Sequence, residues 1–234
     1  MSFSTIAFDL DGTLVDTAPD LIETLNDLLL DNRIPALPYD EARTMIGAGV
    51  KPLIKRALAA QRVEVSAEGV DALFVTYLDR YAARIAARSR PFPGLEHALD
   101  ALAADGYRFA VCTNKLEWLS VRLLDALDLS ERFEAICGQD TFGIAKPDPQ
   151  MFRRTIEKAG GDPALALMVG DSAADINVAR AAGVPVIAVD FGYTDTPVQQ
   201  LGPDRIISNF KSLRAAVHEF LPPDMARRRA TTAS

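Results

Sequence analysis

Two carboxylates close an apolar segment near the start of the chain, and together they could bind a metal ion. The segment runs Ile6-Ala7-Phe8-Asp9-Leu10-Asp11-Gly12-Thr13. Side chains alternate along an extended strand, so Asp9 and Asp11 are expected to point the same way at its end. Two like charges so close together share a proton unless a cation lies between them. Because Asp-Gly is also common in plain turns, this pair alone leaves a purely structural role open.

Three later segments place polar side chains after or between apolar runs in a similar way. Residues 107–112 are followed by Thr113-Asn114-Lys115, and residues 164–169 are followed by Gly170-Asp171-Ser172 with Asp175. The third segment is Lys146-Pro147-Asp148-Pro149. Ligands bind at the carboxyl edge of parallel α/β sheets, so the polar residues of all these segments are expected to converge on one crevice.

Helix capping is an alternative explanation for some of these residues. Asn114 with Glu117, and Ser172 with Asp175, both fit the capping box that starts a helix. Asp148 before Pro149 fits an N-cap followed by proline at the first helical position. Capping leaves the following residues unexplained: Asp9, Asp11, Thr113, Lys146 and Asp171.

The charges of the expected crevice favour a divalent cation. Asp9, Asp11, Asp171 and Asp175 bring four negative charges against the one positive charge of Lys146. A bound divalent ion would reduce the excess from three negative charges to one. Carboxylate ligands with room left for substrate oxygens suit Mg²⁺, which also accepts phosphate oxygens as ligands.

The four segments together resemble the motifs of the haloacid dehalogenase superfamily in their order and spacing. The resemblance covers the chain from Thr5 to Leu221. Within the superfamily, residues 14–21, 45–50 and 112–115 are most similar to the phosphoglycolate phosphatases. The resemblance implies a Mg²⁺-dependent hydrolase of phosphate monoesters, with 2-phosphoglycolate as the first candidate substrate and glycolate and phosphate as products.

The resemblance also implies a role for each motif residue. Asp9 would be the nucleophile that forms an aspartyl phosphate, and Asp11 the general acid and then the general base. Thr113 and the backbone N–H of Asn114 would hold the phosphoryl group. Lys146, kept extended by Pro147, would neutralise the charge of its oxygens.

Mg²⁺ would then be bound by the Asp9 carboxylate, the backbone carbonyl of Asp11 and the Asp171 carboxylate, with Asp175 in support. Gly47, in the segment Gly47-Ala48-Gly49, could bring backbone N–H groups to an anionic substrate, although the spacing alone favours an ordinary turn between helices.

Several other functions remain open. The chain could hydrolyse another small ester, such as a sugar phosphate, or pyrophosphate; it could be a phosphomutase or a catalytically inactive binding protein. Relatives that cleave carbon–halogen or carbon–phosphorus bonds lack an aspartate at the position of Asp11, so its presence favours phosphate esters. Lys51 or Lys55 could mimic the Schiff-base lysine of phosphonate hydrolases, but the matching strand motif is missing.

The pattern of apolar residues between the first two motifs is helical. Such residues recur at helical spacing from 21 to 29, from 50 to 60 and from 70 to 87, and Thr17 with Asp20 offers a helix start. No strand pattern intervenes, so residues 16–90 are expected to form an all-helical cap inserted into the core.

Residues 91–94, Pro-Phe-Pro-Gly, return the chain to a core of residues 1–15 and 91–221. Helix and strand patterns alternate there, which predicts an α/β fold with a doubly wound, Rossmann-like parallel sheet. Residues 222–234 are expected to be a flexible tail. We expect the cap to rotate as a lid about its two linkers, with a rigid subdomain as the alternative.

Composition limits the partners of the protein. A formal net charge of −7 argues against nucleic acid, although Arg227-Arg228-Arg229 form one basic cluster near the end. No apolar run is long enough to span a membrane. Cys112 and Cys137 are expected to be buried, reduced thiols, and His97 and His218 surface residues. These features are typical of a cytoplasmic enzyme. The resemblance implies that its partner is a small phosphorylated metabolite, and we expect a monomer or homodimer.

Overall fold

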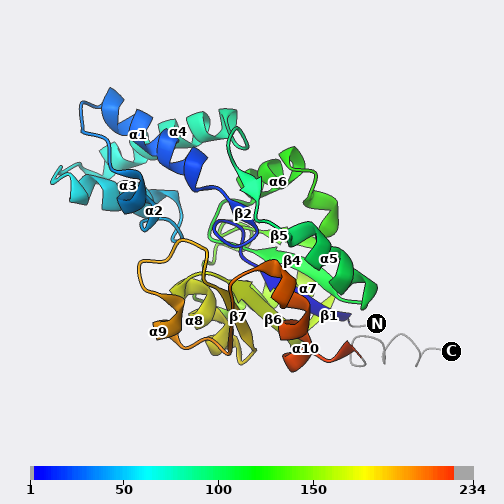
Figure 1. Cartoon of the computed structure of the whole chain (residues 1–234). Coiled ribbons are helices and arrows are strands. Elements are labelled where there is room, and N and C mark those ends of the chain that lie inside the picture. The colour runs from blue at the N-terminus through cyan, green and yellow to red at the C-terminus, as the bar shows by residue number, and fades with distance from the viewer. Residues whose placement is uncertain (1–2, 224–234) are drawn as a thin grey trace.

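A parallel sheet with helices on both faces forms the larger part of the molecule (Figure 1). The structure is a computed structural model that describes residues 3–223, so the basic cluster and nearly all of the expected tail lie outside the described residues. The sheet of this part has six strands in the order β5-β4-β1-β6-β7-β8, all of them parallel. Its strands are β1 (Phe3–Phe8), β4 (Arg108–Cys112), β5 (Ala135–Cys137), β6 (Gly161–Gly170), β7 (Val186–Val189) and β8 (Arg205–Ile207).

Two layers of helices bury the sheet, and each layer packs on residues of a different size. The layer of α5, α6 and α10 packs on large side chains such as Phe8 and Val111. The layer of α7, α8 and α9 packs on small ones such as Ala7 and Ala110. The helices are α5 (Leu95–Ala104), α6 (Glu117–Ala126), α7 (Pro149–Lys158), α8 (Ala173–Ala182), α9 (Val198–Leu201) and α10 (Leu213–Phe220), with 3₁₀ turns at Ser130–Arg132 and Phe210–Ser212.

This arrangement confirms the predicted doubly wound parallel α/β fold. Strands buried on both faces read as continuous apolar runs, which is why the sequence pattern located them well. The central strand β6 begins at Gly161, three residues earlier than expected, and its pairing with β1 is irregular between Phe3 and Thr5. Cys112 and Cys137 lie opposite each other on the neighbouring strands β4 and β5, and both are buried, free thiols.

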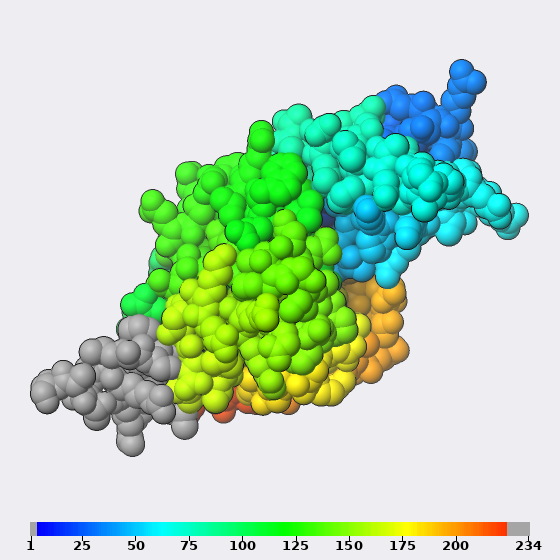
Figure 2. All heavy atoms as spheres, turned by 180° about the vertical axis from the view of Figure 1, so that it is seen from behind, coloured from blue at the N-terminus to red at the C-terminus, as the bar shows by residue number. Residues whose placement is uncertain are grey.

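In the described chain, only helices lie between two short strands, β2 (Val15–Asp16) and β3 (Arg90–Pro91). These strands pair antiparallel, Val15 with Pro91 and Asp16 with Arg90. We call the chain between them the helical insert. Its helices are α1 (Ala18–Asp31), α2 (Tyr39–Arg43), α3 (Val50–Ala60) and α4 (Ala67–Ala83). Figure 2 shows the insert from behind as the blue and cyan end of the molecule, in contact with the rest of the protein.

The beginning and the end of the helical insert are joined at Asp20. Its buried carboxylate accepts hydrogen bonds from the backbone N–H groups of Arg88 and Ser89 and from the hydroxyl of Ser89. The expectation that Thr17 and Asp20 together start α1 is therefore only half right. The helix begins after Thr17, but Thr17 makes no capping hydrogen bond, and Asp20 serves the far end of the insert instead.

Two smaller features complete the fold. His218 was expected at the surface, but it is partly buried, with Nε2 2.9 Å from Oδ2 of Asp105; Arg214 from the same helix also pairs with Asp105. This cluster fastens α10 to the end of α5. Among the helices of residues 3–223, none combines the length and apolar character that a membrane crossing requires.

Candidate active site

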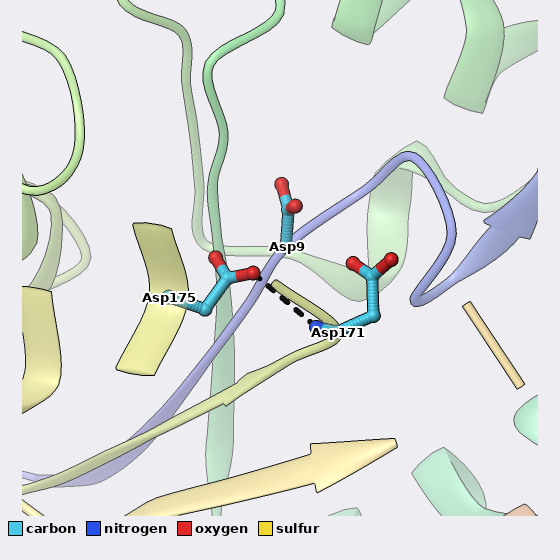
Figure 3. Close-up of side chains that lie close together, drawn as sticks. All are labelled: Asp9, Asp171 and Asp175. Carbon is cyan, nitrogen blue, oxygen red and sulfur yellow. Dashed lines mark hydrogen bonds between the residues drawn. The ribbon is translucent and has the colours of Figure 1, made fainter. Parts of the chain in front are cut away.

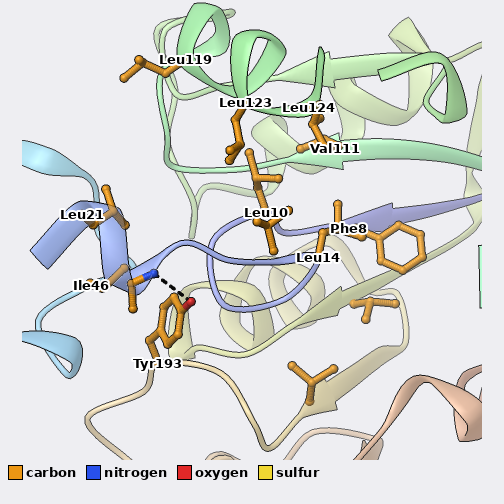
Figure 4. Packing of buried hydrophobic residues seen from close by; sticks show 14 of the residues in the cluster. Phe8, Leu10, Leu14, Leu21, Ile46, Val111, Leu119, Leu123, Leu124 and Tyr193 are labelled. Carbon is orange, nitrogen blue, oxygen red and sulfur yellow. Dashed lines mark hydrogen bonds between the residues drawn. The ribbon is translucent and has the colours of Figure 1, made fainter. Parts of the chain in front are cut away.

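The loop after β1 is held tightly, and it fixes the positions of Asp9 and Asp11. The backbone N–H groups of Leu14 and Val15 both donate to the carbonyl of Leu10. Leu10 and Leu14 are fully buried and lie beside leucines of α6 (Figure 4). Gly12 has a φ of 83°, and a Cβ atom there would lie 2.5 Å from Oδ2 of Asp171. Glycine is therefore required at this turn, both for its backbone angle and for the close approach of Asp171.

Three carboxylates from two strand ends converge beside this loop (Figure 3). Asp9 follows β1, Asp171 follows β6, and Asp175 lies in the first turn of α8. One oxygen of each lies within 4.8 Å of the others, and all three residues are buried. The structure thus brings together three of the acids that the sequence placed in one crevice.

Lys146 is the cation of this cluster. Its buried ammonium lies 2.5 Å from Oδ1 of Asp175 and 2.9 Å from Oδ1 of Asp9. Burial acts to lower the pKa of Lys146, but the two carboxylates outweigh burial and raise it above its ordinary value. The Asn114 side chain positions Lys146: its carbonyl accepts from the Lys146 N–H at 2.8 Å, and its amide donates to the Lys146 carbonyl. Lys146 therefore stays charged and fixed in place.

For Asn114 and Asp175, the structure shows which residue caps a helix and which contributes to the site. Asn114 does not cap α6, which begins at Glu117, so that capping interpretation is wrong. Asp175 does close the capping box of α8, accepting from the N–H and the hydroxyl of Ser172, and it also binds Lys146. Asp148 is an N-cap, accepting from the Gln150 N–H. One aspartate thus serves both the helix and the cluster.

The donor set fits a divalent cation with oxygen ligands. Burial, together with Asp175 and Asp11 and against the opposing effect of Lys146, raises the pKa of Asp9 to about 6. Burial, Asp175 and Asp9 raise the pKa of Asp171 well above its ordinary value. Three buried carboxylates facing one ammonium leave negative charge that a cation would balance.

The hydrogen bonds of the three acids show which of them have lone pairs left. Asp175 uses Oδ1 for Lys146, and Oδ2 accepts three hydrogen bonds. Asp171 accepts one hydrogen bond at each oxygen, from the Thr13 hydroxyl and the Tyr193 N–H. Within residues 3–223, Oδ2 of Asp9 accepts none that the structure shows. Asp9 and Asp171 can therefore bind a cation, whereas Asp175, with four hydrogen bonds, has the fewest lone pairs left.

A small cavity lies between this cluster and the helical insert. The volume open to the centre of a water molecule inside it is about 30 Å³. Its wall consists of polar core residues and mostly apolar residues of the insert: Asp9, Asp11, Thr113, Asn114 and Lys115 from the core, and Leu21, Ile46, Gly47, Gly49, Val50 and Leu53 from the insert.

The sequence-predicted residues take different places around this cavity. Thr113 is buried, and its hydroxyl accepts a hydrogen bond from the Lys115 N–H. Gly47 and Gly49 belong to the wall, and a Cβ atom on Gly49 would lie 3.1 Å from the carbonyl of Asn114. The loop of the insert therefore lies directly against the core segment that follows β4. Asp11 lies at the cavity, outside the cluster of Asp9, Asp171 and Asp175.

Two contacts of Asp11 and Asp171 were not expected from the sequence. Nζ of Lys115 lies 3.0 Å from Oδ1 of Asp11, and it donates to the hydroxyl of Tyr81, a residue of α4, at 2.8 Å. The only signal for Lys115 was its position after Thr113 and Asn114. Tyr193 donates its N–H to Asp171, while its hydroxyl donates to Asp16 and accepts from the N–H of Ala18 (Figure 4). Tyr193 thus connects the cluster to the start of the insert.

Comparison with known proteins identifies the family of this chain. Residues 6–189 match the family model of haloacid dehalogenase-like hydrolases. A protein of Mesorhizobium japonicum named phosphoglycolate phosphatase is 47% identical over 221 residues, which are 94% of this chain and 97% of that protein. One of Caulobacter vibrioides with the same name is 48% identical over 88% of this chain and 87% of its own length.

A solved structure with the same arrangement is the crystal structure of a predicted phosphoglycolate phosphatase from Haemophilus somnus. It superposes with a TM-score of 0.85 at 32% sequence identity, covering 92% of this chain and 98% of that one. The likeness extends over the sheet and the helical insert alike.

Proposed function

The chain belongs to the haloacid dehalogenase-like hydrolase family, and on this basis we propose that it is a Mg²⁺-dependent phosphatase that hydrolyses 2-phosphoglycolate to glycolate and phosphate. The observation that carries the reaction class is the buried cluster in which Lys146 binds Asp9 and Asp175 beside Asp171. The names of the relatives that match most of the chain support the substrate.

In the proposed reaction Asp9 is the nucleophile. Its Oδ2 attacks phosphorus, the bond between phosphorus and the ester oxygen breaks, and Asp11 donates a proton to the leaving oxygen. Asp11 then takes a proton from a water molecule, which attacks the phosphorus of the aspartyl phosphate. Phosphate leaves and the Asp9 carboxylate is restored, so two displacements replace one difficult hydrolysis.

The surrounding residues hold the phosphoryl group in this proposal. Thr113 donates its hydroxyl proton and Asn114 its backbone N–H to phosphoryl oxygens, while Lys146 faces the charge that develops on them. Asp9, the backbone carbonyl of Asp11 and Asp171 would hold Mg²⁺, with Asp175 in support. When bound, the ion neutralises phosphate charge and aligns the phosphoryl group with the nucleophile.

We further propose that residues 16–90 form a cap that opens about β2 and β3. A cavity of about 30 Å³ is far smaller than a usual ligand site, so a substrate needs movement of the insert to enter. Gly47 and its neighbours would then close over the leaving group. We also propose that residues 1–15 and 91–221 form the core. The protein would be cytoplasmic and a monomer or homodimer.

The test is a panel of phosphate esters with the purified protein and Mg²⁺, compared by kcat/KM. We expect 2-phosphoglycolate to exceed sugar phosphates and nucleotides, and chelation to abolish turnover. Asp9→Asn should lower turnover at least about a thousandfold, because the nucleophile is lost. Asp125→Asn changes an exposed aspartate of α6 and serves as the control. Full activity of Asp9→Asn, or of the chelated enzyme, would contradict the mechanism.

A further inference from the structure

Lys115 lines the cavity, but the proposed mechanism gives it no function. Among the described residues that line the cavity, it is the one basic side chain. Lys146 pairs with Asp9 and Asp175, and it is not among the residues that line the cavity. The side chain of Lys115 is only 3% exposed, so its ammonium faces the inside of the site and not the solvent.

The contacts of Lys115 hold its ammonium in place at the wall of the cavity. Nζ donates to the two oxygens of Asp11 at 3.0 and 3.3 Å and to the hydroxyl of Tyr81 at 2.8 Å. The Tyr81 ring also lies under the ammonium, 4.4 Å from Nζ to its centroid.

Because the rest of the wall is apolar, acidic or uncharged, an anionic leaving group enclosed there needs a positively charged partner. Leu21, Ile46, Val50 and Leu53 of the insert surround the space in front of Lys115 with apolar side chains. A carboxylate enclosed by such side chains without a partner would carry a large desolvation cost. Lys115 is the group placed to offset it.

We propose that Lys115 binds the carboxylate of the substrate's leaving group, and that it thereby selects phosphate esters of short hydroxy acids. This inference rests on the proposed phosphatase function and deepens it. Asp11 contacts the ester oxygen in that function, and in an ester of an α-hydroxy acid the carboxyl carbon lies two bonds beyond that oxygen. The ammonium 3.0 Å from Asp11 is therefore at the position that the carboxylate reaches.

The experiment compares 2-phosphoglycolate with 2-hydroxyethyl phosphate, in which an alcohol replaces the carboxylate. The readout is the ratio of the two kcat/KM values, because loss of the Lys115 contact with Asp11 affects both esters alike. We expect Lys115→Met to lower this ratio at least about thirtyfold, the loss that follows when one partner of a buried charge pair is removed. Lys51→Met, which removes a lysine of α3 paired with Asp71, is the matched control and should leave the ratio unchanged.

An unchanged ratio in Lys115→Met would overturn the proposal and would assign Lys115 to holding Asp11 alone. If the variant does not fold, the wild-type enzyme still decides, since a preference for the charged ester below about threefold contradicts a carboxylate site. A different result would contradict the proposed substrate without contradicting the role of Lys115. If another pair, such as 2-phospholactate and its alcohol analogue, shows the better turnover and the same Lys115-dependent ratio, 2-phosphoglycolate is wrong while the role of Lys115 stands.

Discussion

Asp9, the proposed nucleophile, should lower the stability of the metal-free protein, so we expect Asp9→Asn to stabilise the fold while it abolishes turnover. Asp9 is 4% exposed and lies beside two other buried carboxylates. Burial is the main reason that its pKa rises from an ordinary 3.8 to about 6, even with Lys146 at 2.9 Å. Asparagine has nearly the shape of the protonated acid and never carries the charge.

The magnitude follows from the pKa. A rise of about two pKa units corresponds to about 3 kcal/mol, since one unit is about 1.4 kcal/mol. Between pH 3.8 and 6 the folded protein keeps a proton that the unfolded chain has lost, so the contribution of Asp9 to stability falls as pH rises through this interval. Below pH 3.8 Asp9 is protonated in both the folded and the unfolded state, so no stability is lost. Above pH 6 it is ionised in both states, and the full loss of about 3 kcal/mol applies.

The assay is urea unfolding of wild type and Asp9→Asn in EDTA, at pH 4 and at pH 7.5. At pH 7.5 we expect Asp9→Asn to be more stable by about 3 kcal/mol, or about 6 to 12 °C in Tm for a chain of this size. At pH 4 the two proteins should be nearly equal. Added Mg²⁺ should narrow the difference at pH 7.5, because it binds the folded wild type. A less stable Asp9→Asn, or a difference that does not vary with pH, would refute the reasoning.

Three further predictions concern Asp11, Asp105 and the linkers of the insert. Asp11→Asn should slow alkyl phosphates far more than nitrophenyl phosphate, because only a poor leaving group needs its proton; equal losses in kcat would exclude the acid role. Arg214 and His218 hold the pKa of Asp105 at about 2, so Asp105→Asn should cost about 1 kcal/mol above pH 4, as measured by urea unfolding, and this cost should vanish as pH falls through 2. NMR relaxation dispersion should show exchange near residues 16 and 90 in the free enzyme and lose it with a phosphate mimic; a flat profile in both states would favour a rigid insert.

The core of the fold could be predicted from the sequence because its signals are local. Val186–Val189 and Val50–Ala60 have the expected bounds, since an apolar run and a helical stripe define them without help from distant residues. The helix Tyr39–Arg43 was missed because it has five residues and buries only Ala42, so no stripe exists to find. The convergence of Asp9, Lys146 and Asp171 followed from the rule for parallel sheets.

The missed contacts are those between segments that have no regular relation in sequence. Tyr81 lies within the helical pattern of residues 70–87, and nothing local indicates that its hydroxyl reaches Lys115, 34 residues away. Tyr193 lies in a loop, and its bonds to Asp171 and Asp16 depend on how that loop folds over the sheet edge. Asn114 matched a capping pattern, but the backbone of Lys146 offers its side chain two hydrogen bonds. In each case tertiary contacts override the local pattern.

The hydrogen bonds of Asp20 to Arg88 and Ser89 have a consequence for how such an enzyme can change. They bring the two ends of the helical insert together beside the pairing of β2 with β3, so the chain leaves and rejoins the sheet at a single junction. A segment of another length whose ends lie equally close could replace the insert there without altering any sheet strand. Substrate range could therefore diverge by exchange of one cassette, while the chemistry at the strand ends is inherited unchanged.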